Sequence, residues 1–251
     1  VVDYLEAIRK CGWSIIFVTS CGTLNKNERN KLSQSVSIVI GTRGEGRDWG
    51  NYSIGYARCK RFGTIKNLLL ANDSVYGPIG NLYGFFEFSK KTKADMVGMT
   101  NSLQYGNHLQ SYFILCKENL CSHKLFEHFW NTFYYQSEKD EIIYKNEIGF
   151  SQFFTRYGFV IEAYHDYESL KADTIRNKSF GYKLLEKGLH VNPTHHFIQL
   201  LLDKYDSPFV KIELLKFNPS KIKDLDKIRK AIGLKNKVLS LQIKKHLKRC
   251  S

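Results

Sequence analysis

Residues 66–74 read KNLLLANDS and form the clearest strand pattern in the sequence, because three leucines and an alanine end abruptly in three polar residues. A short apolar run with such an end is typical of a strand buried in a sheet. Similar apolar runs occur at residues 14–20 and 35–41. Further strands are expected at residues 95–100, 111–116 and 159–164.

Segments of helical length separate these runs. They lie at residues 25–34, 52–62, 122–134 and 148–157, and the opening VVDYLEAIRKCGW has the apolar spacing of an amphipathic helix. Strands that alternate with helices imply βαβ units. The sequence therefore predicts an α/β fold with a mostly parallel central sheet flanked by helices.

Ligands of open parallel sheets bind at the carboxyl ends of the strands, so the polar residues after residues 68–71 are candidates for a site. These are Asn72, Asp73 and Ser74. A carboxylate at this position can hold Mg²⁺ or Mn²⁺ against a diphosphate. The alternative is an Asx turn that only ends the strand.

A glycine-rich segment, TRGEGRDWGNYSIGY, follows the run at residues 35–41. Glycines allow the backbone to approach a phosphate or ribose closely, and the two arginines, Arg43 and Arg47, and Asp48 supply charged and hydrogen-bonding partners. Trp49, between Asp48 and a glycine, is the tryptophan that we expect to contact a ligand, whereas Trp130 is expected to pack. The segment is neither a GxGxxG motif nor a P-loop, and a glycine-rich turn with solvated arginines remains the alternative.

Glu147 is predicted to open a helix whose apolar face includes Ile148, Phe150 and Phe154. The arrangement resembles the catalytic-base element of inverting GT-A glycosyltransferases, in which an acidic residue deprotonates the acceptor hydroxyl. A carboxylate at a helix start is also favoured by the helix dipole, so simple capping is the alternative.

The formal charge of +14 is concentrated at the end of the chain. Residues 221–251 carry eleven Lys or Arg and two Asp, a net charge of +9. A nucleic-acid-binding protein needs Lys and Arg over the whole binding face, so no nucleic-acid partner is expected. The apolar spacing of residues 219–251 indicates amphipathic helices, which either lie on an anionic membrane or pack on their own domain.

The remaining composition limits the classes of protein. No apolar run approaches the roughly 18 residues that a membrane-spanning helix requires. The six cysteines form no CxxC pair and no zinc-binding pattern, which favours reduced thiols and a cytoplasmic location.

Taken together, these segments resemble the rhamnan synthesis protein F family of bacterial polysaccharide glycosyltransferases. The resemblance runs almost end to end. It rests on RGEGRDWGNY, LLLANDSVYGPI, HLQSYFILCKENL with FEHFW, NEIGFSQFF, and NPTHHFIQLLLDKYDSPFVKIELLKFNP. It implies a Rossmann-like GT-A domain over residues 1–218, followed by the basic helical tail.

The resemblance also implies an activity. The expected reaction transfers rhamnose or another deoxyhexose from a nucleotide sugar, dTDP-rhamnose first among them, to a growing cell-surface or lipid-linked glycan. The enzyme would act in the cytoplasm or on the cytoplasmic face of the inner membrane. A noncatalytic carbohydrate- or nucleic-acid-binding module on the same scaffold is the alternative, and a retaining transferase is a closer one.

The resemblance assigns roles to single residues. It implies a donor pocket at Arg43, Asp48 and Trp49, a diphosphate and metal locus at Asn72, Asp73 and Ser74, an acceptor wall at His108 and Gln110, and Glu147 as base, with Asp73 also counted among the catalytic residues. His195 is a candidate ligand for metal or diphosphate, with a hydrogen-bonded imidazole in a loop or on the surface as its alternative.

Two features depart from the family pattern. Relatives begin with an apolar strand before the helix that opens this chain, so the nucleotide pocket is expected to be incomplete without it. The triplet Asn72–Ser74 also lacks the Asp-x-Asp pattern of metal-dependent relatives. A divalent cation, Mg²⁺ or Mn²⁺, is therefore an open expectation.

Overall fold

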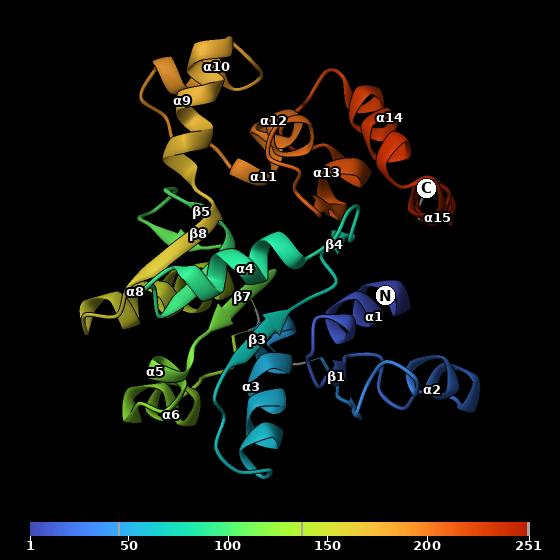
Figure 1. The fold of residues 1–251 in the computed structure, drawn as a ribbon, viewed down its shortest axis with the longest axis vertical. Coiled ribbons are helices and arrows are strands. Elements are labelled where there is room, and N and C mark those ends of the chain that lie inside the picture. Colours follow the sequence, from blue (N-terminus) through green and yellow to red (C-terminus); the bar gives the residue numbers. More distant parts are fainter. Residues whose placement is uncertain (45, 137, 250–251) are drawn as a thin grey trace.

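The apolar runs of the sequence form strands, and helices lie between most of them (Figure 1). The computed structural model describes residues 1–44, 46–136 and 138–249. The strands are β1 (Ile16–Thr19), β2 (Ile38–Gly41), β3 (Leu68–Ala71), β4 (Val75–Tyr76), β5 (Met96–Ser102), β6 (His108–Leu109), β7 (Phe113–Cys116), β8 (Ile161–His165) and β9 (Val210–Lys211).

The helices fall into two stretches of chain. Before β8 they are α1 (Val2–Lys10), α2 (Lys26–Leu32), α3 (Arg47–Lys60), α4 (Tyr83–Lys91), α5 (Glu118–Cys121), α6 (Lys124–Asn131), α7 (Lys139–Glu141), the π-helical η1 (Ile142–Ile148) and α8 (Gly149–Arg156). After β8 they are α9 (Tyr167–Asn177), α10 (Tyr182–Glu186), α11 (Pro193–His196), α12 (Ile198–Asp203), α13 (Ile212–Phe217), α14 (Leu225–Lys235) and α15 (Lys237–Arg249).

The central sheet has the strand order β3-β7-β5-β6, and β8 also pairs with β5. Strand β7 runs antiparallel to both β3 and β5, β6 runs antiparallel to β5, and β8 runs parallel to β5. The prediction of a mostly parallel sheet is therefore wrong for this sheet. The cause is the short connection from Ser102 to Phe113, which holds no helix, whereas a parallel return needs a crossover of about a dozen residues or more.

Two smaller sheets flank the central one. Strands β1 and β2 pair in parallel with α2 between them in the chain, as the βαβ prediction requires. Strand β4 pairs with β9 in antiparallel register, Val75 opposite Lys211 and Tyr76 opposite Val210. This pair joins the segment after β3 to a part of the chain that is far away in sequence.

Both faces of the central sheet are covered, and the side chains of each strand alternate between two cores. Leu70 and Ile114 face an aromatic core beneath α3, α6 and α8, which contains Trp49, Trp130 and Phe150. Residues such as Leu69, Phe113 and Val97 face a second core, to which α1 and α4 contribute. This double burial explains why the strands read as continuous apolar runs.

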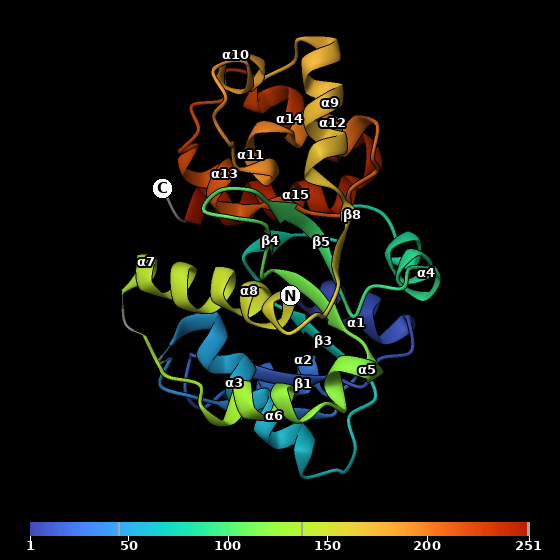
Figure 2. The same cartoon turned by 90° about the vertical axis from the view of Figure 1, so that its left-hand side faces the viewer.

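The basic tail forms helices, as predicted, and α14 and α15 lie beside α12 and α13 (Figure 2). Ile228, Ile232 and Ile243 are buried in one cluster with residues of α12, α13 and β9. The apolar face of the tail therefore packs on the domain, which is the alternative that the sequence left open. Among the described residues, no helix is long and apolar enough to cross a membrane.

Candidate functional site

The loop that follows β3 is an Asx turn that also carries a longer-range contact. Asn72 Oδ1 accepts hydrogen bonds from the backbone N–H of Ser74 at 3.1 Å and from its Oγ at 2.6 Å. The amide Nδ2 of Asn72 donates to Asp48 Oδ2 at 2.8 Å. The loop is therefore tied to the first turn of α3, and Asp73 is left exposed beside it.

The pKa of Asp48 depends on its burial and on the charges around it. Burial raises the pKa of its carboxyl first, and the negative charges of Asp73 and Glu147 raise it further. The positive charges of Lys211 and Arg47 act in the opposite direction. The side chains of Asp73 and Glu147 thus lie within electrostatic range of a common neighbour, although they are far apart in the chain.

Glu147 lies inside a helical stretch, not at its start. The stretch begins at Lys139, and Glu147 belongs to the π-helical turn η1. Helix capping therefore does not explain this carboxylate, and the prediction that Glu147 opens a helix is wrong. π-Helical turns inside helices occur frequently at functional sites.

The carboxylate of Glu147 is held by a small set of donors. Oε2 accepts the backbone N–H of Ser111 at 3.0 Å and also the Ser111 hydroxyl. His108 Nε2 lies 3.7 Å from Oε1, and 19% of the Glu147 side chain is exposed. Burial alone would raise the pKa of Glu147, but His108, Ser111 and the charge of Lys211 outweigh it, so the pKa is lowered. The group is an anion at neutral pH.

Of the two residues expected to form the acceptor wall, one adjoins Glu147. His108 is buried and its Nδ1 lies 2.9 Å from the carbonyl oxygen of Gly106. Gln110 is bound instead into a buried network, because its Oε1 accepts from Thr100 Oγ1 at 2.8 Å. That hydroxyl also lies 2.9 Å from Tyr112 Oη.

Trp49 does not have the location that a ligand contact requires. Only 2% of it is exposed, and its ring stacks on Trp130 at 6.2 Å and contacts Phe150 at 5.0 Å between ring centroids. The expectation that Trp49 contacts a ligand is therefore corrected, and both tryptophans belong to the aromatic core. The burial of Trp49 follows from its helical spacing with Tyr52 and Tyr56 on α3.

Arg43 and His195 are the remaining residues that the sequence singled out. Arg43 is exposed on the loop between β2 and α3, where Gly44 and Gly46 adopt positive φ angles of 80° and 72°. His195 is hydrogen-bonded, with Nδ1 3.0 Å from Ser220 Oγ, but it is buried on α11 and lies neither in a loop nor on the surface. Within the described residues no three His, Cys, Asp or Glu side chains are grouped to hold a metal ion.

Sequence reasoning missed two residues of this site, Lys211 and Ser111. Lys211 Nζ donates to Ser74 Oγ at 3.0 Å and lies 4.6 Å above the centre of the Tyr112 ring. A single lysine inside the apolar run PFVKIELL was the available signal for Lys211. Ser111 stands in the block HLQSYF, and nothing local distinguishes it.

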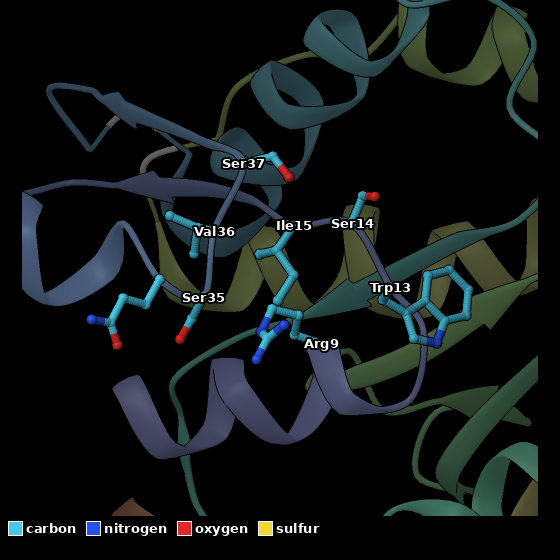
Figure 3. Close-up of a pocket in the computed structure, with 8 residues that line it drawn as sticks. Arg9, Trp13, Ser14, Ile15, Ser35, Val36 and Ser37 are labelled. Atoms are coloured by element: carbon cyan, nitrogen blue, oxygen red, sulfur yellow. The ribbon is translucent and has the colours of Figure 1, made fainter.

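A separate cavity of about 260 Å³ lies elsewhere, between α1 and the segments that lead into β1 and β2. Figure 3 shows Arg9, Trp13 and Ser35 among the residues around it. Ile15 and Ser37 directly precede the two strands, so this cavity is at their amino ends. The loop with Asp73 follows the carboxyl end of β3, so the cavity is not part of the carboxylate site.

Comparison with known proteins gives the chain relatives. The model of the rhamnan synthesis protein F family matches residues 15–231. The uncharacterized protein y4gN of Sinorhizobium fredii is 29% identical over 171 residues, covering 66% of this chain and 44% of the relative. The virulence protein VirA of Vibrio anguillarum is 30% identical over 223 residues, covering 80% of this chain and 70% of the relative. The chain thus spans less than half of y4gN, and no solved structure matches it. Because the family model covers most of its length, the chain belongs to the rhamnan synthesis protein F family.

Proposed function

We propose that the chain is an inverting glycosyltransferase of polysaccharide synthesis with a GT-A-like catalytic domain. Membership of the rhamnan synthesis family supports the reaction class. The single observation that supports the site is that Asn72 and Glu147 bind adjacent residues of one segment: the backbone N–H of Asn72 donates to the carbonyl oxygen of Tyr112 at 3.2 Å, and the backbone N–H of Ser111 donates to Glu147 Oε2 at 3.0 Å. The donor is a nucleoside-diphosphate deoxyhexose, with dTDP-rhamnose as the first candidate.

In this proposal Glu147 is the general base. It accepts the proton of the acceptor hydroxyl while that oxygen attacks the anomeric carbon, and the bond from this carbon to the diphosphate breaks. The Ser111 and His108 contacts keep the carboxylate ionised and fix its position before the acceptor binds. A bound diphosphate adds negative charge nearby, which raises the pKa of Glu147 and makes it a stronger base.

A divalent cation, if the reaction uses one, would be held by Asp73. The described residues offer no group of three protein ligands, so the remaining ligands would come from the diphosphate and water. Mg²⁺ bound to one or two carboxylates and substrate phosphates is a common arrangement. No step of the proposed mechanism passes through the cation.

The acceptor is proposed to be a lipid-linked glycan at the cytoplasmic face of the inner membrane. The exposed apolar side chains of α14 and α15, Leu234, Val238 and Leu241, support this, since lysines lie close to them in the sequence. Such a surface can rest on an anionic bilayer while the buried face of the same helices stays packed.

The test compares Glu147→Gln with Glu141→Gln in a donor screen over dTDP-, UDP- and GDP-sugars, with and without Mn²⁺. Glutamine can still accept the Ser111 N–H bond, so the fold and donor binding should persist while transfer falls by about 100-fold or more. Glu141 is an exposed residue of the same helical stretch, paired with Lys145, and its variant should retain activity.

Three results would count against parts of the proposal. Full turnover by Glu147→Gln would remove its role as base. Tight binding to oligonucleotides with no response to any nucleoside diphosphate would favour a noncatalytic module. A product with retained anomeric configuration by NMR would replace the inverting mechanism.

A further inference from the structure

Lys211 is placed at the site by the pairing of β4 with β9. It lies opposite Val75 in the register, and the backbone N–H of Ile212 donates to the carbonyl oxygen of Ser74 at 3.0 Å. The loop after β3 is therefore fastened on one side to β9. The side chain of Lys211 reaches from this strand toward Ser74.

The ammonium group of Lys211 has a defined position. Its hydrogen bond to Ser74 Oγ and its position above the Tyr112 ring fix it from two directions. Ser74 Oγ is in turn bound to Asn72, and only 1% of Tyr112 is exposed. A cation that is held by a buried ring and a fixed loop loses little conformational freedom on binding an anion.

The charge of Lys211 acts on two carboxylates from different parts of the fold. Its positive charge helps to lower the pKa of Glu147 on η1, and at Asp48 on α3 it opposes the rise in pKa that burial causes. These two groups and Asp73 together present negative charge that repels an incoming phosphate. A nucleoside diphosphate that binds at the end of β3 therefore needs a cation on the protein, and Lys211 Nζ is hydrogen-bonded to Ser74 in the loop that follows this strand.

We propose that Lys211 Nζ and Ser74 Oγ form the subsite that binds the diphosphate of the sugar donor. This inference rests on the proposed glycosyltransferase function. When the bond between the anomeric carbon and the diphosphate breaks, its electron pair goes to the diphosphate oxygen. Lys211 offsets this new negative charge while it keeps its own proton. The proton of the acceptor hydroxyl goes to Glu147, so the step balances without a further reactant.

The experiment measures binding by calorimetry in the presence of EDTA. The probes are dTDP, UDP and GDP, and each is compared with its own nucleoside. The variants are Lys211→Met, which keeps the apolar stem over Tyr112, and Lys211→Arg, which keeps the charge. Lys216→Met is the matched control, because Lys216 on the adjacent α13 lies over the ring of Phe217.

The proposal expects Lys211→Met to weaken binding of the tightest diphosphate by about 10- to 100-fold and to leave nucleoside binding unchanged. Lys211→Arg should recover part of the loss, and Lys216→Met should bind as the wild type does. Unchanged diphosphate binding by Lys211→Met would overturn the subsite and leave the proposed function standing. Equal losses for diphosphate and nucleoside would overturn it as well. A wild-type chain that binds none of the three diphosphates, either in EDTA or with Mn²⁺ added, would overturn both proposals.

Discussion

Acid should destabilise this protein through His165, a buried histidine at the end of β8. Only 2% of it is exposed, and it lies opposite Thr100 in the pairing of β8 with β5. Burial lowers the pKa of the imidazole from 6.5 to about 4, and the charge of Asp206 offsets only part of this effect. Below pH 6.5 the unfolded chain therefore binds a proton that the folded chain does not bind until about pH 4.

The size of the effect follows from linkage. The free energy of unfolding decreases as the pH falls from 6.5 toward 4, by about 1.4 kcal/mol per pH unit. Between pH 7.5 and pH 4.5 this amounts to about 2 to 3 kcal/mol. Below pH 4 both states carry the proton, so this contribution no longer changes.

The assay is urea unfolding, followed by tryptophan fluorescence, at pH 7.5 and at pH 4.5. Wild type should lose about 2 to 3 kcal/mol more than His165→Gln over this interval, because groups common to both proteins cancel in the difference. His128→Gln, which alters an exposed histidine on α6, is the control and should follow the wild type. If His165→Gln loses as much stability as the wild type, the burial argument is refuted.

Two further predictions concern the site and the tail. Ser111→Ala removes a hydroxyl that stabilises the ionised form of Glu147, so the pKa of Glu147 should rise. The acid limb of the pH profile of sugar transfer should then move to higher pH by roughly one unit or less. An acid limb that does not move would contradict the role of Glu147 as the base. Ile243→Asp places a charge at a position that is 3% exposed and should cost about 3 kcal/mol or more in urea unfolding, while Leu241→Asp, 57% exposed on the same helix, should change stability by about 0.5 kcal/mol or less. Equal losses would contradict the packing of α15.

The sequence predicts the positions of the strands better than their directions. β2 and β3 fall inside the predicted residues 35–41 and 66–74, because burial on both faces leaves a continuous apolar run. No residue of β7 reveals that it runs against its neighbours β3 and β5. Direction depends on the connection between strands, which a local pattern does not contain.

The candidate site was predictable where polar residues follow the end of a strand, and less so elsewhere. Asn72 and Asp48 were singled out because polar residues after an apolar run mark the edge of a sheet, and they are hydrogen-bonded to each other. Trp49 was misjudged because its polar neighbours concealed its helical spacing with Tyr52 and Tyr56. Lys211 was missed because only the β4–β9 pair brings it to Ser74.

The interleaved order of the central sheet has a consequence for synthesis on the ribosome. β3 and β5 are separated in space by β7, which is made after both, so a nascent chain that ends before Cys116 cannot complete this sheet. The hydrogen bond between Ser74 and Lys211 forms later still, because Lys211 is synthesised after Cys116. Apolar strands remain unpaired over this interval, when a partly made chain is most exposed to aggregation. Early chaperone contact is therefore to be expected on the leucines of β3.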